Sequence, residues 1–211
     1  MTLRLHHSPM ACSLASRFAL AETGLPHEVV VVRTARGENK TAAYLQINPR
    51  GKVPALQTDG GVLTESTAIL PYIADLAADS GLLAPAGSFA RAQAQSWLSF
   101  LSSTVHAAYT GALRAEAFEG CDPEAVRKVH LARLQTALQE LDAHLEDREF
   151  LLEAFSICDL YLLVFLLWRG APAVAGRLSP LPNLDRFQQR MLARPALAAT
   201  LGEDMKLMAE A

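Results

Sequence analysis

A cysteine and a serine, Cys12 and Ser13, stand together in the segment HHSPMACSLASR, between a short apolar stretch and a helical pattern. Where a strand turns into a helix, free backbone N–H groups and the positive end of the helix dipole stabilise a thiolate. The sequence therefore predicts a lowered pKa for the Cys12 thiol and a nucleophilic sulfur at neutral pH. The alternative is a small apolar residue that begins a helix.

Two further positions break the local pattern in ways that suggest function. Pro54 interrupts the strand-like KVPAL, and proline cannot donate to a central ladder, so a special backbone geometry is expected unless this is an edge strand. Glu65 and Ser66 fall at the start of a helix, where a hydroxyl and unpaired N–H groups can hold a carboxylate. Simple helix capping would look the same in the sequence.

A polar seam follows one face of the first long helix of the second half. Ser99, Ser102 or Ser103, His106 and Thr110 recur at steps of three or four residues beside an apolar row. An imidazole in such a seam can bind a ligand, or it can be solvated or satisfied in the core.

The elements that must position these residues are predicted from periodicity and turn residues. Leu3 to His7 is a strand, a helix follows and ends near Gly24, and Glu28 to Arg33 holds four valines typical of a strand buried on both faces. Asp59-Gly60-Gly61 predicts a hairpin, and Thr64 to Thr67 offers caps for a helix over Ala68 to Ala77. The order βαβ then ββα is that of a thioredoxin-like domain.

The remainder of the chain reads as helical. Long helices are expected over Ser88 to Ala117 and Asp122 to Glu146, and shorter ones from Ser156, Asn183 and Pro195. Ser156 and Asp159 form a capping box, which leaves Cys158 as a buried packing residue. We therefore expect a thioredoxin-like α/β domain at 1–78, a linker at 79–87 where Gly and Pro interrupt the pattern, and an all-α domain at 88–211.

Composition excludes several classes of function. A formal net charge of -3 argues against a nucleic-acid partner, and the longest apolar run, Leu160 to Trp168, is far shorter than the ~20 residues of a membrane span. The three cysteines form no disulfide pattern, and no Cys/His cluster has zinc-like spacing, so no metal is expected. No secretory signal is visible from Met1 to Leu5, and we expect a cytoplasmic protein.

Six motifs in order show a resemblance that spans nearly the whole chain: SPMACSLA, NPRGKVPAL, LTESTAI, WLSFLSSTVH, FSICDLYLL and QRMLARPAL. The chain resembles the cytosolic glutathione transferases, most closely the bacterial beta class. The resemblance implies that glutathione is the co-substrate, that small hydrophobic electrophiles are conjugated for detoxification, and that the protein is a two-fold homodimer.

The resemblance also assigns roles to residues. It implies catalytic roles for Cys12, Ser13 and His106, with His106 pointing into the glutathione site. Pro54 is implied to be a cis-proline that leaves the backbone of Val53 free to pair with glutathione, and Glu65 is implied to meet the γ-glutamyl ammonium group. The residues expected to bind glutathione are Arg36, Val53, Pro54, Glu65, Ser66, Ser99 and Ser103.

Three alternatives stay open. Ser13 is either a donor to the glutathione thiolate, as a serine or tyrosine is in other classes of the family, or a helix N-cap. The chain could be a glutathione-dependent thiol or peroxide reductase that forms a mixed disulfide at Cys12; Ala15 stands where redox proteins place a resolving cysteine, so the second thiol must come from outside. It could also be a non-catalytic protein that binds apolar ligands.

The sequence departs from the beta-class pattern at several positions. Met10 stands where glycine is usual, Ser99 where asparagine is usual, and Ala107 where lysine follows the histidine. These departures imply weaker or rearranged contacts to glutathione.

Overall fold

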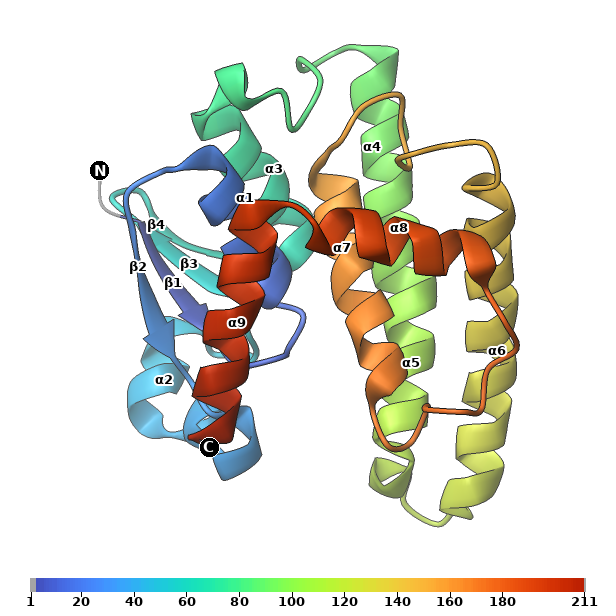
Figure 1. Ribbon diagram of the computed structural model, residues 1–211. Helices are drawn as coiled ribbons and strands as arrows, with labels where there is room; N and C mark the ends of the chain where they lie inside the picture. Colours follow the sequence, from blue (N-terminus) through green and yellow to red (C-terminus); the bar gives the residue numbers. More distant parts are fainter. Residues whose placement is uncertain (1–2, 211) are drawn as a thin grey trace. The chain divides into compact units, whose positions relative to one another are not determined.

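The computed structural model describes residues 3–210, so the ends of the two expected domains at Met1, Thr2 and Ala211 lie outside it. The chain divides into two compact units (Figure 1). The first joins residues 1–84 to residues 192–211, and the second spans residues 85–191. The division falls inside the expected 79–87 linker, but the last helix groups with the first unit. The domain limits 1–78 and 88–211 stay a prediction about independent folding.

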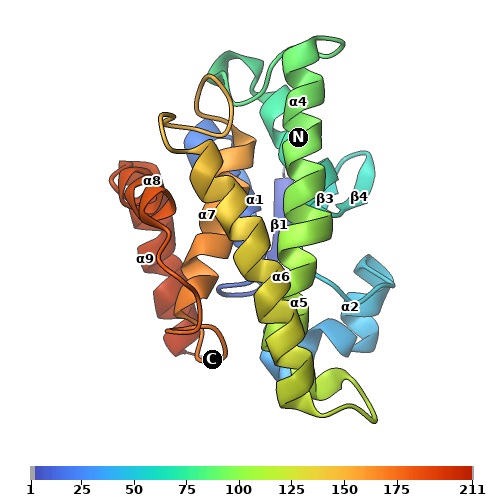
Figure 2. The same cartoon turned by 90° about the vertical axis from the view of Figure 1, so that its right-hand side faces the viewer.

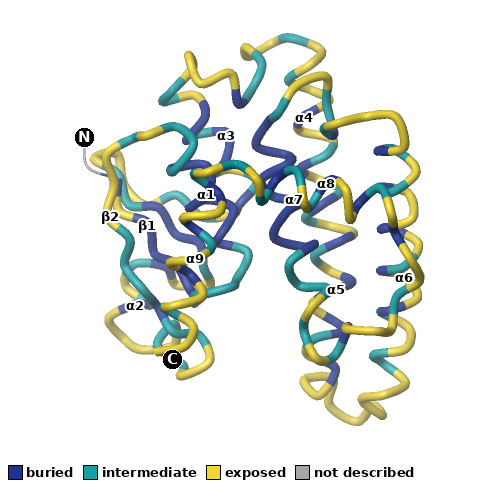
Figure 3. Tube along the Cα trace, viewed as in Figure 1, coloured by how far each residue is buried: buried dark blue, intermediate teal, exposed yellow. Residues whose placement is uncertain are grey.

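A mixed sheet forms the centre of the first unit, as expected for a thioredoxin-like domain. Its strands within the described residues are β1 (Leu3–His7), β2 (His27–Val31), β3 (Ala55–Thr58) and β4 (Gly61–Thr64), in the order β2-β1-β3-β4. β1 and β2 are parallel, whereas β3 is antiparallel to both β1 and β4. Thr58 pairs with Gly61, so Asp59 and Gly60 form the predicted tight turn. β1 is almost wholly buried (Figure 3).

The first unit also contains four α-helices: α1 (Leu14–Thr23), α2 (Ala42–Ile47), α3 (Ser66–Leu76) and α9 (Pro195–Ala209). α1 packs against both α3 and α9. α1 ends where expected, because Gly24 takes the left-handed conformation with φ of 64° and its N–H caps the carbonyl of Leu20. α2 places the Tyr44 ring edge-on to His6 of β1, 5.7 Å between centroids.

Two local expectations for the first unit were wrong. The valine-rich strand is not buried on both faces. β2 lies at the edge of the sheet, and of the four valines only Val32, which follows β2, is buried. The helix expected over Ala68 to Ala77 begins at Ser66, and Glu65 at its cap position makes no side-chain cap bond within the described chain. Two 3-10 turns, Thr34–Arg36 and Glu38–Lys40, follow β2 and lead into α2.

The second unit is all helical, as predicted. It consists of α4 (Phe89–Phe100), a π-helical segment (Leu101–His106), α5 (Ala107–Leu113), α6 (Pro123–His144), α7 (Ile157–Leu167) and α8 (Pro182–Leu192). α6 runs beside α5, as the turned view shows (Figure 2). The expected helix over 88–117 is therefore interrupted, and the interruption holds His106. π-Helical turns are frequent at functional sites.

The buried centre of the second unit is α7, whose first ten residues are inaccessible to solvent. Ser156 and Asp159 form the predicted capping box at its start, and the Cys158 sulfur donates to the carbonyl of Ala94 at 3.4 Å. Cys158 is thus the buried packing residue that was expected. No helix within residues 3–210 is long and apolar enough to cross a membrane.

Candidate glutathione site

The segment from Ser8 to Ser13 turns the chain from β1 into α1 and carries Cys12. Two backbone bonds tighten it, from Ala11 N–H to the Ser8 carbonyl at 3.1 Å and from Leu14 N–H to the Ala11 carbonyl at 3.0 Å. The Cys12 thiol donates to the carbonyl oxygen of Val53 at 3.5 Å. Two segments that are 41 residues apart in sequence therefore meet at this sulfur.

The pKa of the Cys12 thiol is raised to about 11. Burial is the main cause and the Glu65 carboxylate adds to it; the Ser66 hydroxyl and the N–H groups of Cys12 and Ser13 lower the pKa by less. The expected lowering is therefore wrong for the free protein, because desolvation outweighs the helix terminus. A neutral thiol is a donor, in keeping with its bond to Val53.

The Val53–Pro54 peptide bond is cis, as the resemblance implied. The preceding carbonyl, that of Lys52, accepts hydrogen bonds from Tyr44 Oη at 2.6 Å and Asn48 Nδ2 at 2.8 Å. These two buried side chains fix the backbone that leads into Val53. Neither Tyr44 nor Asn48 was predicted from the sequence, because a hydrogen bond to a backbone carbonyl leaves no pattern of residue types.

The backbone at Gly51, just before Lys52, leaves no room for a side chain. Its φ is 59°, and a Cβ there would lie 2.9 Å from the carbonyl oxygen of Asn39 and 3.3 Å from Leu45 Cδ2. Asn39 Nδ2 also donates to the Gly51 carbonyl at 2.8 Å. The close approach of the two backbones therefore depends on glycine.

Glu65 and Ser66 lie at the start of α3. Ser66 is buried and its hydroxyl interacts with the Cys12 thiol, whereas Glu65 is exposed and pairs with Arg50 at 3.0 Å. Glu65 has φ of 72° and ψ of 126°, a region that side chains rarely occupy. Backbone strain of this kind costs about 1–3 kcal/mol and is concentrated at ligand sites, so this conformation is a local indication of function.

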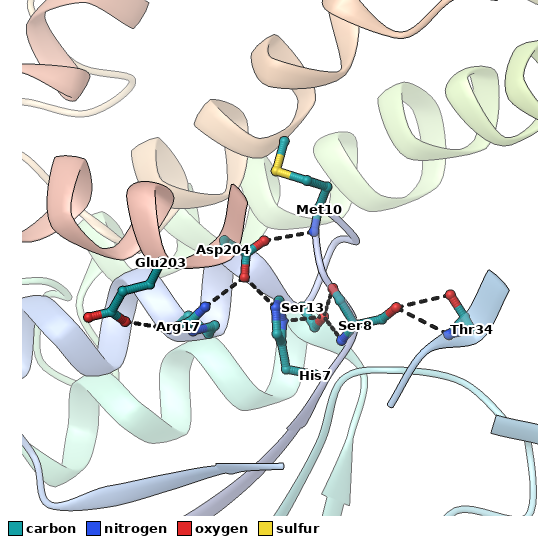
Figure 4. Close-up of polar contacts among 8 residues, drawn as sticks. All are labelled: His7, Ser8, Met10, Ser13, Arg17, Thr34, Glu203 and Asp204. Carbon is teal, nitrogen blue, oxygen red and sulfur yellow. Dashed lines mark hydrogen bonds and ion pairs between the residues drawn. The ribbon is translucent and has the colours of Figure 1, made fainter. Parts of the chain in front are cut away.

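Ser13 faces the interior of the first unit, not its surface. Its hydroxyl is fully buried, lies 2.8 Å from His7 Nδ1 and accepts from Ser8 N–H at 3.2 Å (Figure 4). Ser13 does stand at the N-cap position of α1, but its side chain makes no cap bond within residues 3–210. Its catalytic role stays a prediction.

A buried carboxylate completes this network from the last helix. Asp204 Oδ1 accepts from His7 Nε2 and from Arg17 Nη1, both at 2.6 Å, and Asp204 Oδ2 accepts from Met10 N–H at 2.7 Å. Burial acts to raise the pKa of Asp204, but the His7 ring, Arg17 and the Met10 N–H together hold it below its ordinary value. The carboxylate is therefore ionised at neutral pH.

His7, Arg17 and Asp204 were not among the site residues predicted from the sequence. His7 and Asp204 are 197 residues apart, and no local pattern relates them. One signal was available: Asp204 stands seven residues after Leu197 and four after Thr200, both buried, so it falls on the inward face of α9. A carboxylate on an inward face needs a partner.

Arg36, expected to bind glutathione, lies exposed at the end of the 3-10 turn Thr34–Arg36. Its guanidinium donates to the carbonyl of Glu210 at 3.3 Å. The structure therefore places Arg36 beside the end of α9, and its role toward glutathione stays a prediction.

The candidate residues of the second unit have different surroundings. His106 packs among aromatic rings, 5.4 Å from Phe165 and 5.3 Å from Trp168 between centroids. Ser99 and Ser103 are exposed on their helix, and the Ser103 hydroxyl donates to the Ser99 carbonyl at 2.8 Å. No group of three metal-ligating side chains occurs in the part of the chain that the structure describes.

Two family models match the chain, one in each half. Residues 9–76 match the model described as "Glutathione S-transferase, N-terminal domain", and residues 102–195 match "Glutathione S-transferase, C-terminal domain". Together they cover most of the chain, including Cys12, Val53, Ser66 and His106.

Named relatives and solved structures agree with these models. The chain is 34% identical to glutathione S-transferase GstA of Escherichia coli O157:H7, over 96% of this chain and 98% of the relative. It is 37% identical to glutathione S-transferase GST-4.5 of Xanthomonas campestris, over 94% and 97%. Among solved structures it resembles the beta-class enzyme of Sphingomonas chungbukensis, with 36% identity and a TM-score of 0.85 over 95% and 98% of the two chains. A sphingomonad glutathione S-transferase complexed with glutathione has 38% identity and a TM-score of 0.83 over the same shares.

Proposed function

Because the chain belongs to the glutathione S-transferase family, we propose that it conjugates glutathione to small hydrophobic electrophiles and holds the tripeptide in its first unit. One observation carries the proposal: the Cys12 thiol, the Ser66 hydroxyl and the backbone of Val53 meet at one place. A peptide thiol presents a sulfur, an amide and a charged amino-acid end, and this place has a counterpart for each.

The sulfur would lie beside Cys12. Conjugation needs the glutathione sulfur as a thiolate, so the thiol proton first passes to solvent. The sulfur electron pair then forms the new bond to carbon as halide leaves an aryl halide, as the C–O bond of an epoxide opens to an alkoxide, or as the C=N electron pair of an isothiocyanate moves to nitrogen; solvent supplies the proton for the last two. Because the Cys12 thiol keeps its own proton at neutral pH, it can donate a hydrogen bond to that thiolate. In this account Cys12 is a donor to the reacting sulfur and does not itself attack.

The amide of glutathione would pair with the backbone of Val53. The Val53 carbonyl already accepts a hydrogen bond from Cys12, so a ligand amide could share it or replace the thiol there. Because Lys52 is held by two buried donors, this backbone is rigid before any ligand arrives.

The charged end of glutathione would lie at Glu65 and Ser66. The Glu65 carboxylate and its Arg50 partner are each more than three-fifths exposed, and such a surface pair is worth little, so either charge can turn to a ligand at small cost. The Ser66 hydroxyl and the start of α3 suit a carboxylate. The roles of the other candidate residues in binding or catalysis stay predictions; these residues are Arg36, Pro54, Ser99, Ser103 and His106.

We also propose that the protein belongs to the beta class and acts as a cytoplasmic homodimer in detoxification. Support comes from the beta-class structure that it resembles at 36% identity. Sedimentation of the purified chain tests the dimer: a species of only 22.8 kDa would contradict it.

Conjugation assays with Cys12 variants test the function. Purified protein is incubated with glutathione and a panel of aryl halides, epoxides and isothiocyanates. Cys12→Ser keeps a donor and should retain most of kcat, whereas Cys12→Ala should lower kcat by about tenfold or more, the effect of one lost donor to a developing anion. No turnover by the native chain with any of these would reject the proposal.

The same variants separate conjugation from the two alternative functions. Conjugation that survives Cys12→Ala would show that conjugation does not depend on a mixed disulfide at Cys12, and would point to Ser13 or His106. A glutathione-sized mass adduct on the native protein, with all activity lost in Cys12→Ser, would support the reductase instead. Tight binding of an apolar dye without turnover and without competition from glutathione would support a non-catalytic binding protein.

A further inference from the structure

The turn that carries Cys12 is fixed by a charge from the other end of the chain. Asp204, on α9, accepts the Met10 N–H at 2.7 Å, two residues before Cys12 (Figure 4). We propose that Asp204 is a positioning residue for the glutathione site, which holds this turn so that Cys12 lies against Val53. The proposal rests on the function assigned above to the first unit.

Met10 is the residue of the turn that most needs such a restraint. Its φ of 56° lies in the left-handed region, which residues other than glycine adopt at a cost. A hydrogen bond to an ionised carboxylate is among the strong ones and can hold a backbone there. Without it, Met10 can relax toward the extended or right-handed region, and Cys12 moves with it.

The same carboxylate also supports the two ends of the turn. Through Oδ1 it orients the His7 ring, whose Nδ1 lies 2.8 Å from the Ser13 hydroxyl, and that hydroxyl accepts from Ser8 N–H. Ser8 Oγ in turn lies 3.0 Å from Thr34 Oγ1 after β2. The first, middle and last parts of the turn are thus tied to one buried anion.

Other contacts of α9 hold the helix but not the turn. Glu203 pairs with Arg17 at 2.8 Å, and Arg194 pairs with Glu22 at the end of α1. These pairs join α9 to α1. A purely structural role for Asp204 would make it one more such pair, whereas a positioning role requires an effect on the glutathione site.

The test compares Asp204→Asn with a neighbouring control. Asparagine keeps the shape but presents an NH₂ group in place of one oxygen. Its remaining oxygen belongs at the Oδ1 position, where two donors, His7 and Arg17, meet it, so the NH₂ group faces Met10 N–H and that amide loses its acceptor. The Kd for glutathione, measured by calorimetry, should rise about tenfold, and KM should rise with it. At saturation kcat should change little, because bound glutathione returns the turn and Cys12 to their native positions, and the cost of that return appears in Kd. Glu203→Gln, one residue away on the exposed side of α9, should leave both at the native values.

A second variant separates positioning from structure. Met10→Gly added to Asp204→Asn lets residue 10 adopt its conformation without cost, so it should restore most of the lost glutathione affinity. Glycine at position 10 cannot repair the contact of α9 with α1. Unchanged affinity in Asp204→Asn, or a loss that Met10→Gly does not reverse, would overturn the proposal.

Amide hydrogen exchange gives a measure that needs no ligand. The Met10 amide should exchange slowly in the native chain and in Glu203→Gln, and at least about tenfold faster in Asp204→Asn, because its acceptor is lost. If the native chain binds no glutathione, the proposed function fails, and these rates still decide whether Asp204 holds the turn. If Asp204→Asn does not fold, fast exchange of the Met10 amide in the native chain overturns the proposal and slow exchange supports it.

Discussion

The sulfur of Cys12 lies 3.5 Å from the carbonyl oxygen of Val53, and the thiol is the donor. This contact joins the turn after β1 to the cis-proline segment before β3. It also requires that the thiol keep its proton, because a thiolate beside a carbonyl oxygen would be repelled.

The pH dependence of the rate of Cys12 alkylation should therefore reflect the high pKa of this thiol. In the free protein the rate of iodoacetamide addition at Cys12 should rise through pH 9 without levelling off, because burial raises the pKa of this thiol to about 11. Mass spectrometry of the Cys12 peptide measures the rate, in a Cys121→Ser background because Cys121 is exposed. A rate that reaches its plateau near neutral pH would show that the helix terminus outweighs burial after all.

Removal of the Ser13 hydroxyl should reduce stability more than catalysis. Ser13→Ala leaves Ser8 N–H without its acceptor and breaks the contact to His7, and such losses in a buried site cost about 1–3 kcal/mol in the free energy of unfolding. Urea unfolding measures this cost. The matched control is Ser16→Ala, which removes a buried hydroxyl that has no hydrogen-bond partner among residues 3–210 and should be nearly neutral.

The outcome also decides the role of Ser13. We expect kcat of Ser13→Ala to stay within a few-fold of the native value at temperatures where the protein is folded. A fall in kcat of about a hundredfold with unchanged stability would instead identify Ser13 as a catalytic donor.

Gly51→Ala should weaken both the fold and glutathione binding. A methyl group at this position meets the Asn39 carbonyl at 2.9 Å and takes a positive φ, so the free energy of unfolding should fall by about 2 kcal/mol or more. The displaced backbone leads into Val53, so the Kd for glutathione should rise. The matched control is Gly24→Ala. Gly24 also has a positive φ, but no atom of the described chain beyond its neighbouring residues lies within 4 Å of where its Cβ would be, so the free energy of unfolding should fall by only about 1 kcal/mol and the Kd for glutathione should not change.

Much of the fold could be predicted from the sequence because local signals were strong. Asp59-Gly60 marked the hairpin, Gly24 marked the end of α1, and Ser156 with Asp159 marked the start of α7. α2 was missed because six residues are too few to show a helical period. The four valines predicted a strand but could not tell that it lies at an edge, since the order of strands depends on distant segments.

The site was less predictable than the fold, for a physical reason. The sequence places Cys12 at a strand-to-helix turn but does not report how much water reaches the sulfur, and burial decides the direction of its pKa shift. Asp204 and His7 meet only because α9 returns to pack on α1. One sign of the left-handed backbone at Met10 was present but unused: glycine, the residue that takes a positive φ without strain, is usual at this position in the beta class.

The capping box of α7 should impose its own pH dependence on stability. Burial raises the pKa of Asp159 to about 6, against the hydrogen bonds from Leu151 and Ser156 that lower it. The folded state then binds more protons than the unfolded chain between about pH 4 and pH 6, so this residue's contribution to stability decreases as pH rises, by about 3 kcal/mol over two pH units.

Asp159→Asn isolates that contribution. Urea unfolding of both proteins from pH 4 to pH 7 gives the difference in their stabilities, which should shift in favour of the variant as pH rises. The comparison with the variant is needed because Asp204 has a lowered pKa and changes the free energy of unfolding with pH in the opposite direction. The stabilisation from Asp204 is present above its unfolded pKa and is lost as pH falls through its folded pKa. A difference that does not change with pH would contradict the raised pKa of Asp159.

Calorimetric titration of glutathione into the native chain tests the central claim most directly, with S-methylglutathione as the matched ligand that lacks the thiol. The account predicts saturable heat for glutathione at or below millimolar concentration, and weaker binding for both ligands in Gly51→Ala. Absence of saturable heat with glutathione at millimolar concentration would contradict a tripeptide site at Cys12, Val53 and Ser66.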